Sequence, residues 1–369
     1  MRIHRPITTL AALAVTAAAA LGVGTNAFGA GKLTGAGSSL VAPFVDNVWA
    51  PDFQTRTGNS VTYGSVGSGA GIADITGKTV DFGASDAPLT SGQASACSGC
   101  VEIPWALAAT GFSYNLRGVS HLNLSGPVMA AIYLGQITNW NDPAIAKLNK
   151  GETLPNEKIT PVWRSDGSGD TYAFTAYLSK VSHAWASKVG AGTSVTFPVG
   201  TGGKGNSGVA AVVSATAGAI GNNSWFYVRQ AGLKPVAVEN SAGKFVYPYE
   251  PYLVAAASLL EKVPNLNTLS ASTANTIASD LSIVDPPYSK PKKGAKPTAL
   301  QKNEAAAYPL ATFTYVITRP DGANVSLVKQ FITFALSSAE QKKGIGGTLQ
   351  FAPLPGAIAK ADSTAVGKL

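Results

Sequence analysis

Short apolar runs alternate with amphipathic stretches along most of this chain. Helical periodicity predicts helices over 41–56, 72–76, 124–134, 142–150, 171–189 and 325–336. Strand-like runs occur between them, at 60–65, 79–84, 159–164 and 313–318. Alternation of strands with helices is typical of α/β proteins. The pattern therefore predicts an α/β fold whose sheets are mixed or mostly parallel, with helices packed on them.

Two apolar extended segments, 109–115 and 308–315, lie far apart in the sequence. We interpret them as the places where the chain crosses between two lobes. A chain that crosses twice builds one lobe from two segments and the other lobe from one. The expected division is a discontinuous lobe at 31–113 plus 309–369 and a continuous lobe at 114–308, with a ligand cleft between the lobes.

The first thirty residues have the order of a secretory signal peptide. Arg2 and Arg5 precede an apolar run at 10–23, and small residues follow at 27–30. The run is short for a membrane span. We expect cleavage within about Ala27 to Ala30 and a protein that is secreted, either extracellular or periplasmic. Because this region has no cysteine, a lipid anchor is not expected.

The full chain carries a formal net charge of +8, of which Arg2 and Arg5 supply two positive charges. Charged residues make up only 13% of the chain, so a mildly basic secreted protein explains the charge as well as an anionic partner does. The one basic cluster, 290–296, alternates with proline and glycine and lacks interleaved aromatic residues. It predicts an exposed loop, and nucleic-acid binding is not expected.

Two cysteines, Cys97 and Cys100, lie in a turn-rich stretch. In an exported chain a local disulfide is the simplest interpretation of this spacing. A zinc site would need two further ligands, and beyond the signal region the only histidines are His121 and His183, neither at ligand spacing. We therefore predict a Cys97–Cys100 disulfide and no bound metal.

Three glycine-serine turns carry the most specific chemistry of the chain, at 37–39, 67–69 and 167–169. Glycine lets the backbone approach a ligand closely, serine adds a hydroxyl, and a helix that begins after such a turn leaves N–H groups free to bind an anion. Asp86, Arg164 and Asp166 accompany these turns. Together they predict a receptor for an oxyanion.

Seven blocks of sequence show a family resemblance. They resemble, in order along the chain, the phosphate-binding proteins of ATP-binding-cassette phosphate importers. The resemblance implies a two-lobed periplasmic-binding-protein fold of class II that closes on one dehydrated phosphate without a cofactor. It also implies a monomer that is not an enzyme and that delivers phosphate to a membrane permease. The blocks are TGAGSSLVAPF at 34–44, VGSGAGI at 66–72, VDFGASDAPL at 80–89, YLGQITNWNDPAIAKLN at 133–149, RSDGSGDTYAFTAYL at 164–178, GGKGNSGVAA at 202–211 and FAPLP at 351–355.

The resemblance also implies which residues bind the ligand. Family members usually have Thr-Phe where this chain has Ser39-Leu40. Serine keeps the hydroxyl of threonine, and leucine keeps the backbone N–H. In the fifth block, RSDGSGDTYAFTAYL, Asp166 would hold Arg164 in place. The implied ligand residues are Ser39, the backbone N–H of Leu40, Ser68, Asp86, Arg164, Ser168, Gly169 and Asp170, with Asp166 as the residue supporting Arg164.

Each of these roles has a physical reason. Arg164 presents a planar fork that matches two oxygens of a tetrahedral anion. A carboxylate at Asp86 accepts a hydrogen bond from protonated phosphate, whereas fully ionised sulfate has no proton to donate. Sites that bond a specific ligand group reject analogues lacking it by roughly 10⁴-fold. Selectivity for phosphate is therefore expected to depend mainly on Asp86.

Asp170 departs from the family pattern, which usually has threonine there. A second fixed negative charge about 4 Å from a phosphate could cost about 4 kcal/mol at an effective dielectric constant near 20. Asp170 could point away and stabilise the N-terminus of the following helix, or it could accept a second ligand proton. Alternatively, the ligand is a different oxyanion.

Two other classes of function stay open at this point. A hydrolase would need one of the serines as a nucleophile, but the chain lacks a GxSxG motif and only His121 and His183 could act as the base. A secreted module that contacts the cell wall or another protein could keep the same fold. The stretch 202–208 misses the phosphate-loop pattern, because Gly205 follows Lys204, and we interpret it as a structural loop.

Overall fold

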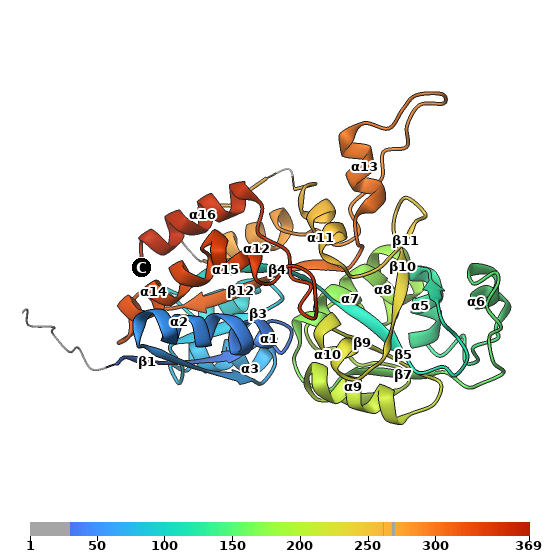
Figure 1. Ribbon diagram of the computed structural model, residues 1–369, viewed down its shortest axis with the longest axis horizontal. Helices are drawn as coiled ribbons and strands as arrows, with labels where there is room; N and C mark the ends of the chain where they lie inside the picture. Colours follow the sequence, from blue (N-terminus) through green and yellow to red (C-terminus); the bar gives the residue numbers. More distant parts are fainter. Residues whose placement is uncertain (1–29, 261, 268–269) are drawn as a thin grey trace, which may run out of the picture.

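The computed structural model describes residues 30–260, 262–267 and 270–369. The predicted signal peptide, 1–30, lies outside the described residues except for its last position. Two separate β-sheets organise the molecule into two lobes that lie side by side (Figure 1).

The first sheet has five strands in the order β2-β1-β3-β12-β4. Strand β1 pairs in parallel with both β2 and β3, and β12 pairs antiparallel with both β3 and β4. Every residue of the long strands β4 and β12 is buried, so both faces of these strands are covered by other parts of the protein. The strand bounds are β1 Lys32–Gly37, β2 Ser60–Ser65, β3 Phe82–Ser85, β4 Val101–Ala109 and β12 Ala311–Thr318.

The second sheet has the order β11-β10-β5-β9-β7-β8, and β6 also pairs with β10. Strand β7 pairs in parallel with β8 and β9, and β5 pairs antiparallel with β9 and β10. Both sheets are therefore mixed, as the sequence predicted. The strand bounds are β5 Gly111–Tyr114, β6 Leu122–Leu124, β7 Thr160–Arg164, β8 Thr201–Gly203, β9 Ala219–Asn223, β10 Lys234–Glu239 and β11 Phe245–Val246.

Helices surround each sheet (Figure 1). Beside the first sheet are α1 Ala42–Phe44, a π-helical turn at Val45–Trp49, α2 Ala50–Thr57, α3 Ser68–Thr76, α4 Ser91–Ala96, α12 Ala271–Asp280, α14 Val325–Ala335, α15 Ser338–Lys342 and α16 Gly356–Gly367. Beside the second are α5 Gly126–Tyr133, α6 Pro143–Leu148, α7 Gly169–Val181, α8 His183–Lys188, α9 Gly205–Ala215 and α10 Trp225–Gln230. Helices α11 Glu250–Ala257 and α13 Ala299–Ala306 lie near the junction.

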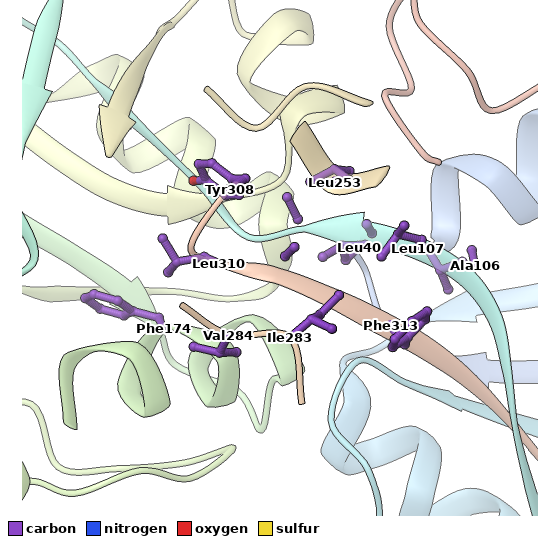
Figure 2. Packing of buried hydrophobic residues seen from close by; sticks show 14 of the residues in the cluster. Leu40, Ala106, Leu107, Phe174, Leu253, Ile283, Val284, Tyr308, Leu310 and Phe313 are labelled. Atoms are coloured by element: carbon purple, nitrogen blue, oxygen red, sulfur yellow. The ribbon is translucent and has the colours of Figure 1, made fainter. Parts of the chain in front are cut away.

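The two lobes are joined where β4 continues into β5 and where the chain enters β12. These connections lie side by side, because the N–H of Thr110 donates to the carbonyl of Leu310 at 3.1 Å and the Tyr308 hydroxyl donates to the carbonyl of Thr110 at 3.0 Å. Apolar side chains pack around both connections, including Leu107, Leu310 and Phe313 (Figure 2). The hydrophobic core is therefore continuous from one lobe to the other.

Most predicted elements are confirmed, with shifted ends. The helix predicted over 171–189 is divided into α7 and α8 at Ser182, whose hydroxyl accepts from the N–H of Trp185 and starts a new helix. Helix α3 begins at Ser68, four residues before the predicted start, because its first turn consists of the small residues 68–71.

The proposed lobe boundaries at 113/114 and 308/309 stay a prediction, and two observations differ from them. Strand β5 already belongs to the second sheet from Gly111 onward. Helix α12 packs against α4 of the first lobe, where Ala274 joins a cluster with Ile72 and Cys97. The segment assigned to the continuous lobe therefore returns to the first lobe at α12, because its apolar face is buried there.

Cys97 and Cys100 are joined by a disulfide, with their Cα atoms 5.5 Å apart, and both are buried beneath α12.

Within the described residues, none of the helices is both long and apolar enough to cross a bilayer.

Gly71 is required for the contact between α3 and the first sheet. An added Cβ at Gly71 would lie 2.6 Å from the carbonyl oxygen of Ala36 and 3.0 Å from that of Ala84. Because both obstacles are backbone, we expect Gly71→Ala to lower the free energy of unfolding by about 2 kcal/mol or more. Urea denaturation measures this. The control Gly92→Ala adds a Cβ with nothing within 4 Å, and an equal loss in both variants would contradict the packing argument.

Candidate functional site

The three glycine-serine turns follow strands whose carboxyl ends meet between the lobes. Strand β1 leads to Ser38 and Ser39, β2 leads to Ser68, and β7 leads to Ser168. Helix α3 begins at Ser68 and α7 begins at Gly169, so their first N–H groups point toward this region. Ligands of open α/β sheets bind at such carboxyl ends.

The two lobes contact each other directly at these turns. The N–H of Gly69 donates to the carbonyl of Gly167 at 2.9 Å, and the N–H of Gly169 donates to the Ser68 hydroxyl at 3.1 Å. A Cβ on Gly169 would lie 2.5 Å from the Cβ of Asp86. Glycine is therefore needed at 169 because the backbones of the two lobes approach so closely. The structure is a closed arrangement.

Asp86 lies at the centre of this contact and is 1% exposed. The Ser38 hydroxyl donates to its carboxylate, at 2.5 Å to Oδ1 and 2.6 Å to Oδ2, and the Ser68 hydroxyl lies 3.4 Å from Oδ2. Burial and the neighbouring charge of Asp170 raise the pKa of Asp86 to about 7, against the opposing effects of Ser38 and Arg164. Asp86 therefore changes its protonation state near neutral pH.

Arg164 is held between two aspartates. Its Nε and Nη2 donate to the Asp166 carboxylate at 2.8 and 2.6 Å, and its Nη1 donates to Asp170 at 2.8 Å. Although burial opposes it, bonding to Arg164 holds the pKa of Asp166 below its usual value. These bonds use three of the five N–H donors of the guanidinium, so two can serve a ligand. Asp166 therefore lies where its predicted role as the support of Arg164 requires, and the role itself stays a prediction.

Asp170 does not point away from the site, and that part of the expectation is wrong. Ser168 is the N-cap of α7, and the Asp170 carboxylate accepts instead from Arg164, from the Thr110 hydroxyl at 2.7 Å and from Asn206 Nδ2 at 2.7 Å. Burial raises the pKa of Asp170, and these three donors oppose the shift. The negative charge that departs from the family pattern is therefore paired inside the protein.

Asn206 is a site residue that the sequence analysis missed. Its Nδ2 donates to the Ser39 hydroxyl of the other lobe at 3.0 Å as well as to Asp170, and its backbone N–H donates to Ser39 at 3.1 Å. The neighbouring N–H of Gly205 donates to Asp166 at 2.9 Å. Asn206 thus bridges the two lobes.

The stretch 202–208 is accordingly more than the structural loop that the sequence predicted. It forms the end of β8, a turn and the start of α9, the same strand-turn-helix arrangement as the other site turns. Gly205 has φ +68° in this turn, so glycine is required there. In the sequence, the pair Gly205-Asn206 at the start of an apolar helical run could have indicated this site turn.

The structure brings the whole predicted set together. Leu40 buries its side chain in the core (Figure 2), while its N–H donates to the Ser38 hydroxyl at 3.0 Å. Ser38 was missed, because the sequence alone did not show which of two adjacent serines faces Asp86. The buried polar side chains of the predicted set are Ser39, Ser68, Asp86, Arg164, Ser168 and Asp170.

No group of three or more histidine, cysteine or acidic side chains suited to a metal ion occurs within the part of the chain that the structure describes. The described groups of the site are hydroxyls, backbone N–H groups, one guanidinium, one carboxamide and three carboxylates. Two lobes that close on such a buried polar site define a solute-binding protein of the periplasmic-binding-protein class.

Comparisons with known proteins agree with this class. The family model "PBP superfamily domain" matches residues 22–339. The chain is 36% identical over 331 residues to the phosphate-binding protein PstS of Xylella fastidiosa strain 9a5c, covering 89% of this chain and 83% of that one. It is 33% identical over 325 residues to the phosphate-binding protein PstS 3 of Mycobacterium tuberculosis, covering 86% and 80%. The chain therefore belongs to the family of PstS phosphate-binding proteins.

Solved structures show the same fold. A high-affinity periplasmic phosphate-binding protein, PfluDING, whose structure was determined with bound phosphate, matches with a TM-score of 0.67 at 19% identity over 90% of this chain and 93% of that one. At this identity the similarity concerns the fold alone.

The raised pKa of Asp86 predicts that the free energy of unfolding depends on pH. Because the folded-state pKa lies above the unfolded one, the unfolding free energy falls as pH rises from about 4 to about 7 and stays lower above pH 7. We expect Asp86→Asn to remove this loss and to stabilise the ligand-free protein at pH 8, by up to about 4 kcal/mol. Thermal denaturation across pH 4–8 measures it.

The control for this variant is Asp74→Asn, which removes a half-buried carboxylate outside the site. An Asp86→Asn protein that follows the pH profile of the unaltered chain would contradict the assignment.

Proposed function

We propose that this protein captures inorganic phosphate between its two lobes and delivers it to the membrane permease of an ATP-binding-cassette importer. The observation that carries the proposal is the convergence of three glycine-serine turns on the buried carboxylate of Asp86, with groups from both lobes. The two relatives named above are phosphate-binding proteins, which supports the same ligand.

Donors from both lobes would satisfy the oxygens of the anion. The first lobe would supply the Ser39 and Ser68 hydroxyls and the N–H of Leu40. The second lobe would supply the Ser168 hydroxyl and the N–H of Gly169, together with the two remaining N–H groups of Arg164. In the closed structure several of these groups hydrogen bond to one another, as Gly169 does to Ser68. Ligand binding would exchange those bonds for bonds to phosphate oxygens.

Net charge does not attract the anion into this site. Three carboxylates, Asp86, Asp166 and Asp170, accompany a single guanidinium, so with all four groups ionised the cluster is negative. Binding would therefore depend on hydroxyl and N–H dipoles, which act strongly where water is excluded. A carboxylate at Asp86 can accept only from a ligand that carries a proton, and this requirement selects phosphate over sulfate.

Asp170 would then be a support for Arg164 and Asn206 more than a direct ligand residue. Two hydrogen bonds of its Oδ2 and one of its Oδ1 are made within the protein. This pairing supports phosphate as the ligand despite the departure from the family pattern, because the Asp170 carboxylate is hydrogen-bonded by Arg164, Thr110 and Asn206.

The proposal also concerns export, oligomeric state and catalysis. We propose an exported monomer that acts without metal, cofactor or catalysis. His121 and His183 are both exposed, and the described contacts of the Ser39, Ser68 and Ser168 hydroxyls include no histidine. A serine nucleophile would therefore lack its base.

Selectivity over sulfate is the sharpest test of Asp86. At pH 8 we expect Asp86→Asn to weaken phosphate binding and to reduce the preference for phosphate over sulfate at least about 100-fold, because an amide can donate to sulfate. In the unaltered protein the preference should narrow from pH 8 to pH 5, because Asp86 is protonated below about pH 7 and can then donate as well. Calorimetric titration with both anions measures this.

The Asp74→Asn variant serves again as the control and should keep the preference at both pH values. Unchanged selectivity in Asp86→Asn would overturn the role of Asp86. A protein that binds neither anion would overturn the proposed function itself.

The bridge formed by Asn206 predicts a smaller loss. Asn206→Ala removes hydrogen bonds to Ser39 across the cleft and to Asp170, so the closed state is stabilised less. We expect phosphate affinity to fall about tenfold, as for the loss of one hydrogen bond to a charged group. Ser207→Ala, one position further in the same helix and exposed, is the matched control. Equal affinity of Asn206→Ala and the unaltered protein would show that the bridge does not stabilise the bound state.

A further inference from the structure

The segment between α12 and α13 forms an arm that projects from the molecule. We define the lysine arm as residues 286–298, which run outward beyond α13 and back (Figure 1). Its tip contains Lys290, Lys292, Lys293 and Lys296, and all four side chains are exposed. No salt bridge joins any of them to a carboxylate of the described residues.

Both ends of the arm are fixed to the body. At one end, the N–H and hydroxyl of Ser289 donate to the buried carboxylate of Glu304 at 2.8 and 3.2 Å. At the other end, Thr298 and Gln301 form a capping box that starts α13. The lysines are therefore carried on a loop with a defined base.

Further positive charge lies at the foot of the arm. A groove of about 350 Å³ there is lined by Lys244, Lys302 and Tyr288, among other residues. Six lysines thus gather on this side of the molecule, and the nearby Glu304 is engaged with Ser289. The arm takes no part in the phosphate site described above.

We propose that the lysine arm binds the anionic headgroups of a phospholipid bilayer. Clusters of four to eight basic residues are typical of segments that recognise anionic lipid, and each adds about threefold to fivefold to membrane partitioning. The arm projects from the body, so it can meet a flat surface without contact between that surface and the two lobes (Figure 1).

The sequence of the arm favours such a surface over other anionic partners. Its lysines are separated irregularly by proline, glycine and alanine, so they present no fixed row of charges to a partner of defined shape. A planar layer of headgroups needs no fixed spacing. Single-stranded nucleic acid would call for stacked aromatic residues, and the tip has none.

This inference goes beyond phosphate capture and does not depend on the cleft. Electrostatic attachment through the arm would raise the concentration of the protein next to a membrane while both lobes stay free to open and close. The attraction would weaken with salt, since charges are screened over about 8 Å at physiological ionic strength.

The test is cosedimentation of the full chain with vesicles of phosphatidylcholine alone or mixed with phosphatidylglycerol, in phosphate-free buffer at low and physiological salt. We expect binding to the anionic vesicles only, with less binding at the higher salt. Changing Lys290, Lys292, Lys293 and Lys296 together to glutamine should lower the partition coefficient roughly 100-fold or more.

A matched control loses the same charge elsewhere. It carries glutamine at Lys147, Lys188, Lys342 and Lys360, four exposed lysines on four different helices. We expect this variant to bind vesicles nearly as well as the unaltered protein. An equal loss in both variants would show that net charge alone is responsible and would overturn the proposal.

Three other outcomes would also overturn it. These are equal binding to neutral vesicles, no binding to anionic vesicles, and full displacement from them by low concentrations of a soluble poly(glycerol phosphate), which would identify a polymer as the partner. Phosphate titration of the same three proteins keeps the two proposals separate. A protein that binds vesicles but not phosphate would contradict the proposed function and leave the arm's role intact.

Discussion

The ion pairs of Arg164 are the interaction on which the closed site depends. The side chain is buried between Asp166 and Asp170, and removing one member of such a buried cluster typically costs 3 to 5 kcal/mol, because an unpaired charge stays behind. Through Asp170 the cluster reaches Thr110, at a connection between the lobes, and Asn206 on α9. Arg164 therefore organises three separate segments before any ligand is considered.

Local chemistry made much of the fold and site predictable. The turns of glycine and serine, the strand at 60–65 and the change from β7 to α7 are determined by residues close together in the sequence, so pattern and composition were enough. The environment of Asp170 was not predictable in this way. Its partners Thr110 and Asn206 are 60 and 36 residues away, and only the folded chain brings them to one carboxylate.

Other differences between the predicted and the observed structure also have physical causes. The choice between Ser38 and Ser39 depends on how the backbone turns after β1, which residue types do not specify. The return of α12 to the first lobe depends on which buried surface accepts its apolar face. Helix α7 ends at Ser182 because the Ser182 hydroxyl caps the next helix, α8. The periodicity of apolar residues favours one continuous helix, and the pattern alone does not show that the cap interrupts it.

The paired connections between the lobes limit how the molecule can move. Thr110 and Leu310 are joined by a backbone hydrogen bond, and the strands on the first-lobe side are buried throughout. These two connections can therefore bend only together, which restricts how one lobe can turn against the other. The Thr110 hydroxyl donates to the Asp170 carboxylate, so this connection lies beside the site. Any turn of one lobe about the connections would move the groups of the site less than the outer surfaces of the lobes. A partner that senses closure would therefore receive the largest signal far from the ligand.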